Sequence, residues 1–288
     1  MKLAPYLRLA RPQQWVKNAF VLPGLIFGHA LGEADKVAAA LIATVAFCLM
    51  SSAVYALNDV FDRERDREHP DKRRRPIASG EIGARAGIVF GLLLAAAALA
   101  LGSGASLVVA EILAAYVLLN LAYSLGLKRV PVVDVFIIAA GFMLRILAGT
   151  VGLGIAPSRW LLLCGFLVTL FLGFAKRRAE LARLAGDAGR HRPVLDAYSG
   201  PFLDGAILAC ATGMLVTYGV YTVWPSTLAL HGTDLTLTLP FVLFGTFRYL
   251  FLLRHRGGGG DPSNQLLEDR WLLGAAAGWA ATVVLLIG

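Results

Sequence analysis

Charged residues are scarce in this chain: they make up 16% of its 288 residues, against about 25% in an ordinary soluble domain. This scarcity excludes a disordered chain, a nucleic-acid-binding domain and a typical cytosolic enzyme. Cysteine is also rare, and Cys48, Cys164 and Cys210 show no CxxC spacing and no histidine neighbours. All three cysteines fall within apolar blocks, which indicates plain buried packing rather than metal or disulfide roles.

The hydrophobic residues, 57% of the chain, are gathered in repeated blocks. A helix that crosses a bilayer needs about 20 mostly apolar residues. Nine blocks approach this length, at 14–32, 37–60, 83–101, 105–125, 132–153, 159–178, 202–224, 236–253 and 270–287. The sequence therefore predicts an all-α, multi-pass membrane protein in which residues 1–288 form one domain, a bundle of about nine transmembrane helices.

The formal net charge is +8, and the cations are unevenly distributed. Lysine and arginine gather before the first block and in the loop after every second block. The opposite loops hold few cations beyond Lys36 and Arg159. Because cytoplasmic loops carry an excess of lysine and arginine, this pattern predicts a cytoplasmic N-terminus and an external C-terminus. The surplus of cations also suits an anionic ligand.

Carboxylates gather just after the second block. Asp59, Asp62 and Asp66 are spaced i, i+3 and i+7, which places them on one stripe of a helix. Carboxylate oxygens are the ligands that Mg²⁺ prefers, and this ion commonly bridges to substrate phosphates. Asn58 could add a neutral ligand or a hydrogen bond. The alternative is a solvated loop in which the acids pair with neighbouring arginines, but ionisable groups at a membrane helix are usually functional.

A run of cations follows, Lys72 to Arg75, between Pro70 and Pro76. The two prolines exclude a continuous helix here. Two interpretations fit the run equally well. It could anchor a cytoplasmic loop by the positive-inside rule, or it could bind phosphate oxygens, which arginine holds with two parallel hydrogen bonds.

Further polar residues lie at or near the ends of other blocks. Lys176, Arg177 and Glu180 end the sixth block, either as an anchor with an internal ion pair or as a second polar wall facing the acidic stripe. Burying the charge of Arg145 in the middle of a membrane helix costs free energy. Arg145 therefore either binds a ligand or stabilises the packing of the helices through an ion pair. The remaining candidates for substrate binding are Lys17, Asn18 and Tyr123.

The stripe from Asn58 to Asp66 resembles the first metal motif of the UbiA superfamily of intramembrane prenyltransferases. Nearly the whole chain shares the resemblance. Longer signatures are similar to one branch, the decaprenyl-phosphate phosphoribosyltransferases: RPQQWVKN at 11–18, HPDKRRRPIASG at 69–80, GFMLR at 141–145 and AKRRAEL at 175–181. This branch transfers 5-phosphoribosyl from phosphoribosyl diphosphate to a polyprenyl phosphate for the arabinose donor of the cell wall.

One departure from the wider superfamily supports that branch. A typical aromatic prenyltransferase carries a second aspartate-rich motif after the sixth helix, whereas this chain has Lys176, Arg177, Arg178 and Glu180 there. The resemblance implies a bacterial plasma-membrane enzyme with its site on the cytoplasmic side, and a homo-oligomer is left open. The alternatives are prenyl transfer from a polyprenyl diphosphate to a small acceptor and, less favoured, a transporter, for which no internal repeat is visible.

The resemblance also assigns roles. Asp59, Asp62 and Lys72 are expected to be catalytic, with Asn58, Asp59, Asp62 and Asp66 around Mg²⁺. Phosphate oxygens of the two anionic substrates are expected on Lys72, Arg74, Arg75, Lys176 and Arg177. The ribose 5-phosphate needs its own cations, for which Lys128, Arg129 and Arg145 are the candidates.

Overall fold

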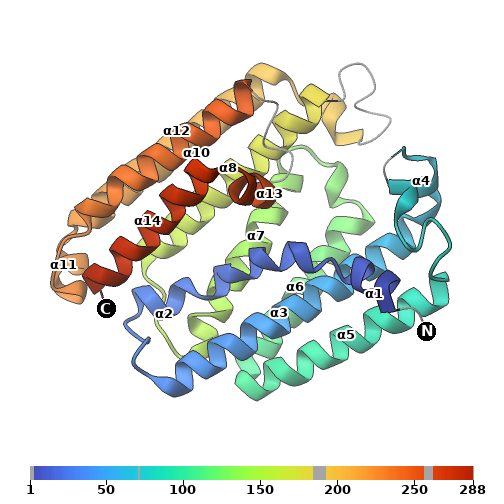
Figure 1. The fold of residues 1–288 in the computed structure, drawn as a ribbon, viewed down its shortest axis with the longest axis horizontal. Helices are drawn as coiled ribbons and strands as arrows, with labels where there is room; N and C mark the ends of the chain where they lie inside the picture. Colours follow the sequence, from blue (N-terminus) through green and yellow to red (C-terminus); the bar gives the residue numbers. More distant parts are fainter. Residues whose placement is uncertain (1–2, 71, 184–192, 256–261, 288) are drawn as a thin grey trace. The chain divides into compact units, whose positions relative to one another are not determined.

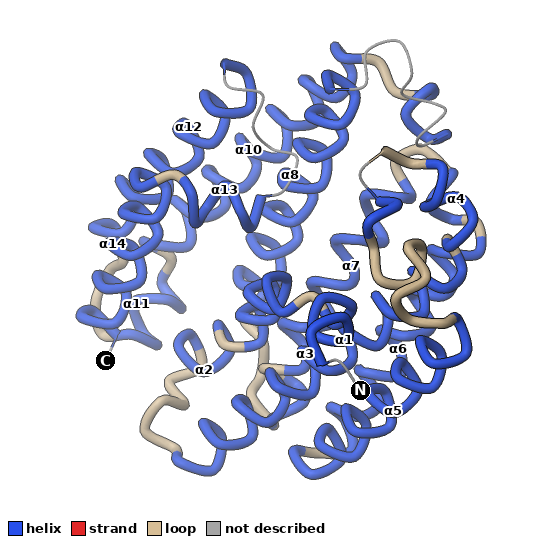
Figure 2. The backbone as a smooth tube through the Cα atoms, turned by 45° about the vertical axis from the view of Figure 1, so that its right-hand side comes forward, coloured by secondary structure: helices blue, strands red, loops and turns tan. Residues whose placement is uncertain are grey.

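The computed structural model describes residues 3–70, 72–183, 193–255 and 262–287. Within these ranges the chain forms helices, loops and turns, and no strand occurs (Figure 2). Eight helices of the described chain are long and apolar enough to cross a membrane. The predicted all-α membrane fold class is confirmed.

The eight candidate spans match eight of the predicted blocks closely. They are α3 (Ala34–Phe61), α5 (Ala84–Ala105), α6 (Leu107–Leu125), α7 (Val133–Ala148) with the 3₁₀ turn η4 (Val151–Leu153), α8 (Arg159–Arg183), α10 (Gly200–Val223), η6 (Thr236–Thr238) with α12 (Leu239–His255), and α14 (Arg270–Ile287). The shorter elements are α1 (Leu3–Ala10), η1 (Pro12–Val21), α2 (Pro23–Phe27), α4 (Arg63–Glu68), η2 (Lys72–Arg74), η3 (Leu127–Arg129), η5 (Pro193–Ala197), α11 (Pro225–His231) and α13 (Pro262–Glu268).

The first predicted block, 14–32, is not one helix, so the count of nine is not confirmed. The 3₁₀ helix η1 ends at Val21 and α2 begins at Pro23. Proline has no N–H to donate and cannot continue an i to i−4 ladder, so the chain breaks here. The amide of Leu22 donates to Ala19 three residues back, which is the tighter 3₁₀ pattern.

The chain divides into two compact units, and the first comprises residues 1–25, 32–125 and 144–156. In this unit α3 packs along α5, and α5 along α6 (Figure 1). Phe47, Met50 and Leu113 are fully buried at its centre. Two backbones touch where η1 passes the end of α7: a Cβ on Gly149 would lie 1.7 Å from the carbonyl oxygen of Val21.

The second unit comprises residues 26–31, 126–143 and 157–288. Here α8 packs along α10, and α12 along α14 (Figure 1). Its largest apolar cluster includes the buried side chains of Phe171, Leu195 and Leu203. The single domain predicted over 1–288 stays a prediction.

Candidate active site

The three aspartates of the predicted stripe lie where α3 meets α4. Asp59 belongs to α3 and Asp66 to α4. Asp62 lies between the two helices with φ −91° and ψ 6°, outside the helical region. The prediction of one continuous helix through all three carboxylates is therefore wrong at Asp62, because the chain bends where the membrane helix ends.

Asp59 is buried and held by two arginines. Its Oδ1 accepts hydrogen bonds from Arg11 Nη2 (2.5 Å) and Arg75 Nη1 (3.1 Å). Its other oxygen, Oδ2, is buried and has no hydrogen-bond partner. A buried carboxylate oxygen without a partner is costly, and such an atom in a native structure commonly binds an ion or a water molecule.

Asp66 shares one of these arginines. Arg75 Nη1 also donates to Asp66 Oδ2 (2.7 Å), so a single guanidinium joins the carboxylates of Asp59 and Asp66. Burial raises the pKa of Asp66 above its ordinary range, while the nearby charges of Arg75 and Lys72 oppose this shift.

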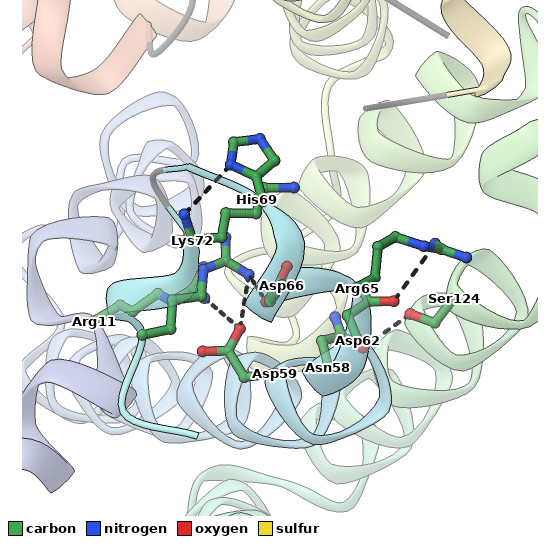
Figure 3. A network of polar contacts seen from close by, with 10 residues as sticks. Arg11, Asn58, Asp59, Asp62, Arg65, Asp66, His69, Lys72 and Ser124 are labelled. Carbon is green, nitrogen blue, oxygen red and sulfur yellow. Dashed lines mark hydrogen bonds and ion pairs between the residues drawn. The ribbon is translucent and has the colours of Figure 1, made fainter. Parts of the chain in front are cut away.

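Asn58 and Asp62 lie on the other side of the α3–α4 junction from Asp59 (Figure 3). Ser124 of α6 donates to Asn58 Oδ1 (2.9 Å). Asp62 lies 3.9 Å from the guanidinium of Arg65. The predicted metal ligands are therefore gathered within one junction but divided between two of its faces.

The junction offers a divalent cation one open carboxylate oxygen but too few protein ligands to hold the ion alone. The unpartnered Oδ2 of Asp59 is a suitable oxygen ligand for Mg²⁺. However, within the described residues no three His, Cys, Asp or Glu side chains come together as a metal cage. Since Mg²⁺ is usually held by one or two carboxylates together with water and substrate phosphates, the junction fits the ion as part of a substrate complex.

The predicted basic clamp surrounds the same junction. Lys72 and Arg74 belong to η2, a single 3₁₀ turn, as the flanking prolines led us to expect. Lys72 is half-buried and its backbone N–H donates to His69 Nδ1 (3.4 Å), whereas Arg74 is exposed. Tyr123, next to Ser124 on α6, is half-buried.

A second polar cluster lies in the other unit, around Arg177 of α8. This arginine is fully buried and donates from Nε to Asp134 Oδ2 (2.6 Å) and from Nη1 to Glu180 Oε2 (2.9 Å). Tyr198 donates its hydroxyl proton to Asp134 Oδ1 (2.7 Å). The guanidinium of Arg177 is thus committed to two carboxylates, and its neighbour Lys176 is only half-buried.

Two more predicted phosphate ligands lie in the same unit. Lys128 and Arg129 form η3, where Lys128 is half-buried and Arg129 exposed.

Arg145 forms a third cluster, within the first unit. Its Nε donates to Asn18 Oδ1 (2.8 Å) and its Nη2 to the hydroxyl of Tyr116 (3.2 Å). The guanidinium also lies over the rings of Tyr116 and Phe47, at 4.8 and 5.4 Å. Lys17, beside Asn18 on η1, is half-buried. Arg145 therefore ties η1 to α6 and α7.

Sequence reasoning gave no role to Arg11, Ser124 or Tyr198. Arg11 stood inside a polar motif, directly before Pro12, which is the one signal that could have singled it out. Ser124 and Tyr198 lie 66 and 64 residues from their carboxamide and carboxylate partners, so nothing local in the sequence marks them.

Comparison with known proteins decides the family. A model of the UbiA prenyltransferase family matches residues 19–266. The chain belongs to the UbiA prenyltransferase family. A UbiA homologue from Archaeoglobus fulgidus, solved with GPP and Mg²⁺ bound, has the same fold: the TM-score is 0.71 at 18% identity, over 97% of each chain.

Two UbiA relatives are similar along almost their whole length. The decaprenyl-phosphate phosphoribosyltransferase of Corynebacterium glutamicum is 33% identical, over 98% of this chain and 86% of its own. The enzyme of the same name from Mycolicibacterium smegmatis is 32% identical, over 96% of this chain and 90% of its own. The resemblance predicted from the signatures is confirmed.

Proposed function

We propose that this protein is an integral-membrane transferase that moves 5-phosphoribosyl from phosphoribosyl diphosphate to a polyprenyl phosphate and releases pyrophosphate. The observation that carries the proposal is the junction of α3 and α4, where Asp59 offers a free oxygen beside Arg75, and where the charge of Lys72 acts on the neighbouring Asp66. The choice among UbiA reactions rests on the names of the two relatives and on the basic sequence that ends α8.

Several described cations are suited to the anionic substrates. In η2, Lys72 is half-buried and Arg74 exposed, and Arg75 is half-buried between two carboxylates. In the second unit, Lys176, Lys128 and Arg129 are partly or fully exposed. We assign the diphosphate to the η2 cations of the first unit, with Lys17 and Tyr123 as further contacts. The assignment of the ribose 5-phosphate to Lys128 and Arg129 stays a prediction from the sequence.

Mg²⁺ is the proposed cofactor, held by Asp59 and Asp66 with Asp62 and Asn58 in support. When bound, it would neutralise charge on the leaving pyrophosphate. Before then, Arg11 and Arg75 keep Asp59 fixed and compensated in its buried position. The site lies at the predicted cytoplasmic face of a bacterial plasma membrane, and the lipid enters from the bilayer.

The reaction does not require a strong general base. A phosphate monoester is already ionised at neutral pH, so its oxygen attacks C1 of the ribose as the bond from C1 to pyrophosphate breaks. The pyrophosphate leaves with the bonding electron pair. Attack from the opposite face inverts C1 and gives a β-linked product. Positioning and charge stabilisation then supply most of the rate.

A product assay tests this proposal. The purified protein receives Mg²⁺, a polyprenyl phosphate and phosphoribosyl diphosphate labelled in the ribose, and label in the lipid phase is measured. Label that appears and vanishes with EDTA is the expected result. No label, in a preparation that consumes a polyprenyl diphosphate with an aromatic acceptor, would establish ordinary prenyl transfer instead.

Two substitutions test the aspartates within the same assay. We expect Asp59→Ala and Asp66→Ala each to lower turnover at least about 100-fold, since the loss of a metal ligand exceeds the usual effect of a residue behind it. Glu64→Ala is the matched control, because Glu64 is an exposed acid on α4 paired with Arg67. Near-normal turnover in either aspartate variant would remove that aspartate from the metal site.

A further inference from the structure

Arg11 has an unusual backbone conformation. It lies between α1 and η1 with φ 53° and ψ 59°, in the left-handed region. For a residue other than glycine this conformation is strained, and it persists only where the surroundings determine it strongly. Strained residues are concentrated at functional sites, which suggests that the conformation of Arg11 serves the neighbouring site.

Ser52 of α3 fixes the chain on both sides of Arg11. Its hydroxyl donates to the carbonyl oxygen of Ala10 (2.7 Å) and accepts from Trp15 Nε1 (3.0 Å). Both Ser52 and Ala10 are buried. Both hydrogen bonds are made by Ser52, so residues 10 and 15 are attached to α3 at the same side chain. The strained Arg11 lies between these two residues.

The side chain of Arg11 then runs along one face of α3. Ser52, Tyr55 and Asp59 are spaced i, i+3 and i+7, so they share this face. The guanidinium lies over the ring of Tyr55, 5.0 Å from its centre, and ends on Asp59 Oδ1. The attachment at Ser52 and the stacking on Tyr55 together set where the guanidinium meets the carboxylate.

The result is an asymmetric carboxylate. With Oδ1 of Asp59 occupied by Arg11 and Arg75, only the buried Oδ2 is open. Arg75 is shared with Asp66 and comes from the loop after η2, whereas the guanidinium of Arg11 donates to Asp59. We propose that Arg11 is the positioning residue that orients Asp59, so that Oδ2 is the oxygen presented to the divalent cation. This inference rests on the proposed function, since that function places the metal at Asp59.

Metal binding tests the inference without turnover. Mn²⁺ serves as the probe, with inorganic pyrophosphate present, and the bound fraction is read from the loss of the free-ion electron paramagnetic resonance signal. Residues that orient a ligand from behind usually change metal affinity about 10- to 100-fold. We expect Arg11→Gln to weaken Mn²⁺ binding by this factor and Arg11→Lys to fall between, since lysine keeps the charge but neither the planar fork nor the ring stacking.

Arg8→Gln is the matched control. Arg8 is an exposed arginine on α1 that pairs with Glu81, so its loss should leave Mn²⁺ binding unchanged. Thermal unfolding of each variant shows that the fold is retained. Mn²⁺ binding as tight in Arg11→Gln as in the unsubstituted protein would overturn the proposal, and so would an equal loss in Arg8→Gln.

The product assay separates this inference from the proposed function. If Mn²⁺ binding falls in Arg11→Gln while no ribose label reaches lipid in the unsubstituted protein, Arg11 keeps its role and the reaction is a different one. If label is transferred but Mn²⁺ binding is insensitive to Arg11, the reaction stands and the positioning role does not. Where the role holds, Arg11→Gln should raise the Mg²⁺ concentration for half-maximal turnover and leave the KM for the lipid phosphate unchanged.

Discussion

Arg145 is a cation whose whole head group is enclosed by the protein. Asn18 and Tyr116 accept from it, and two aromatic rings cover its faces. Loss of a hydrogen bond to a charged group costs about 1.5–3 kcal/mol when a buried partner is left unmatched. We expect Arg145→Met to lower stability by this amount, measured as thermal unfolding in detergent, while exposed Arg159→Met has little effect.

This prediction separates two interpretations of Arg145. If the residue only joins η1 to α6 and α7, the folded fraction of the variant keeps its KM for phosphoribosyl diphosphate. A KM that rises steeply at unchanged stability would instead support the phosphate-binding role suggested by the sequence.

Three residues other than glycine have positive φ within the described chain: Arg11, His29 and Val132. Each stands at a polar contact between distant segments. Arg11 meets Asp59, His29 Nε2 lies 2.6 Å from His231 Nδ1, and the amide of Val132 donates to the hydroxyl of Tyr198 (2.6 Å). In the described chain, the residues with strained backbone therefore coincide with polar contacts that join distant segments.

At the scale of elements, the crossing of η1 over the end of α7 depends on glycine. A Cβ on Gly149 would meet the backbone of Val21, which cannot move aside as a side chain would. We expect Gly149→Ala to destabilise the protein by about 1–3 kcal/mol through overpacking. Gly104→Ala in α5 is the control, because open space surrounds that position and alanine favours a helix. Equal unfolding temperatures for the two variants would contradict this account.

Helix α11 is held by a histidine pair. His231 is buried, contacts His29, and has Tyr221 at its other ring nitrogen (3.1 Å). Burial lowers the pKa of His231, and the neighbouring His29 adds to this shift.

The sign of the resulting pH dependence follows from linkage. The unfolded chain binds the proton more readily, with an ordinary pKa of about 6.5. The stability contribution is therefore complete above about pH 6.5 and is lost as the pH falls from there through the lower folded-state pKa. Unfolding temperatures between about pH 7.5 and 5.5 should fall less in His231→Gln than in the unsubstituted protein, whereas His255→Gln should behave as unsubstituted. A slope unchanged in His231→Gln would contradict the assignment.

Hydrophobic length was enough to predict the eight long helices, because a bilayer demands about 20 apolar residues whatever their partners. It failed at 14–32, where Pro23 and the backbone contact with Gly149 matter more than mean hydropathy. The same division applies to the candidate site. The spacing of Asp59 and Asp66 indicated a shared cluster, but the guanidinium that joins them comes from Arg75, and no periodicity reveals which cation pairs with which acid.

For the whole molecule, the distribution of cations predicts the orientation in the membrane. Asp35, in the first turn of α3, and Glu68, at the end of α4, are exposed residues near opposite ends of α3. In a variant whose three cysteines are replaced, Asp35→Cys should react with a membrane-impermeant maleimide on intact cells. Glu68→Cys should react only after the membrane is permeabilised. The reverse pattern would invert the predicted topology.

The pairing of two aspartates with two arginines at the α3–α4 junction also bears on how the protein is made. Asp59 and Asp66 have compensating charges from Arg11 and Arg75 before any ion arrives. In many metalloproteins the ion is needed for folding, because nothing else neutralises its ligands. Here the chain supplies its own counter-charges, so we expect the protein to fold in the bilayer whether or not the metal is supplied. Chelation should stop catalysis and leave a folded protein that recovers when the ion returns.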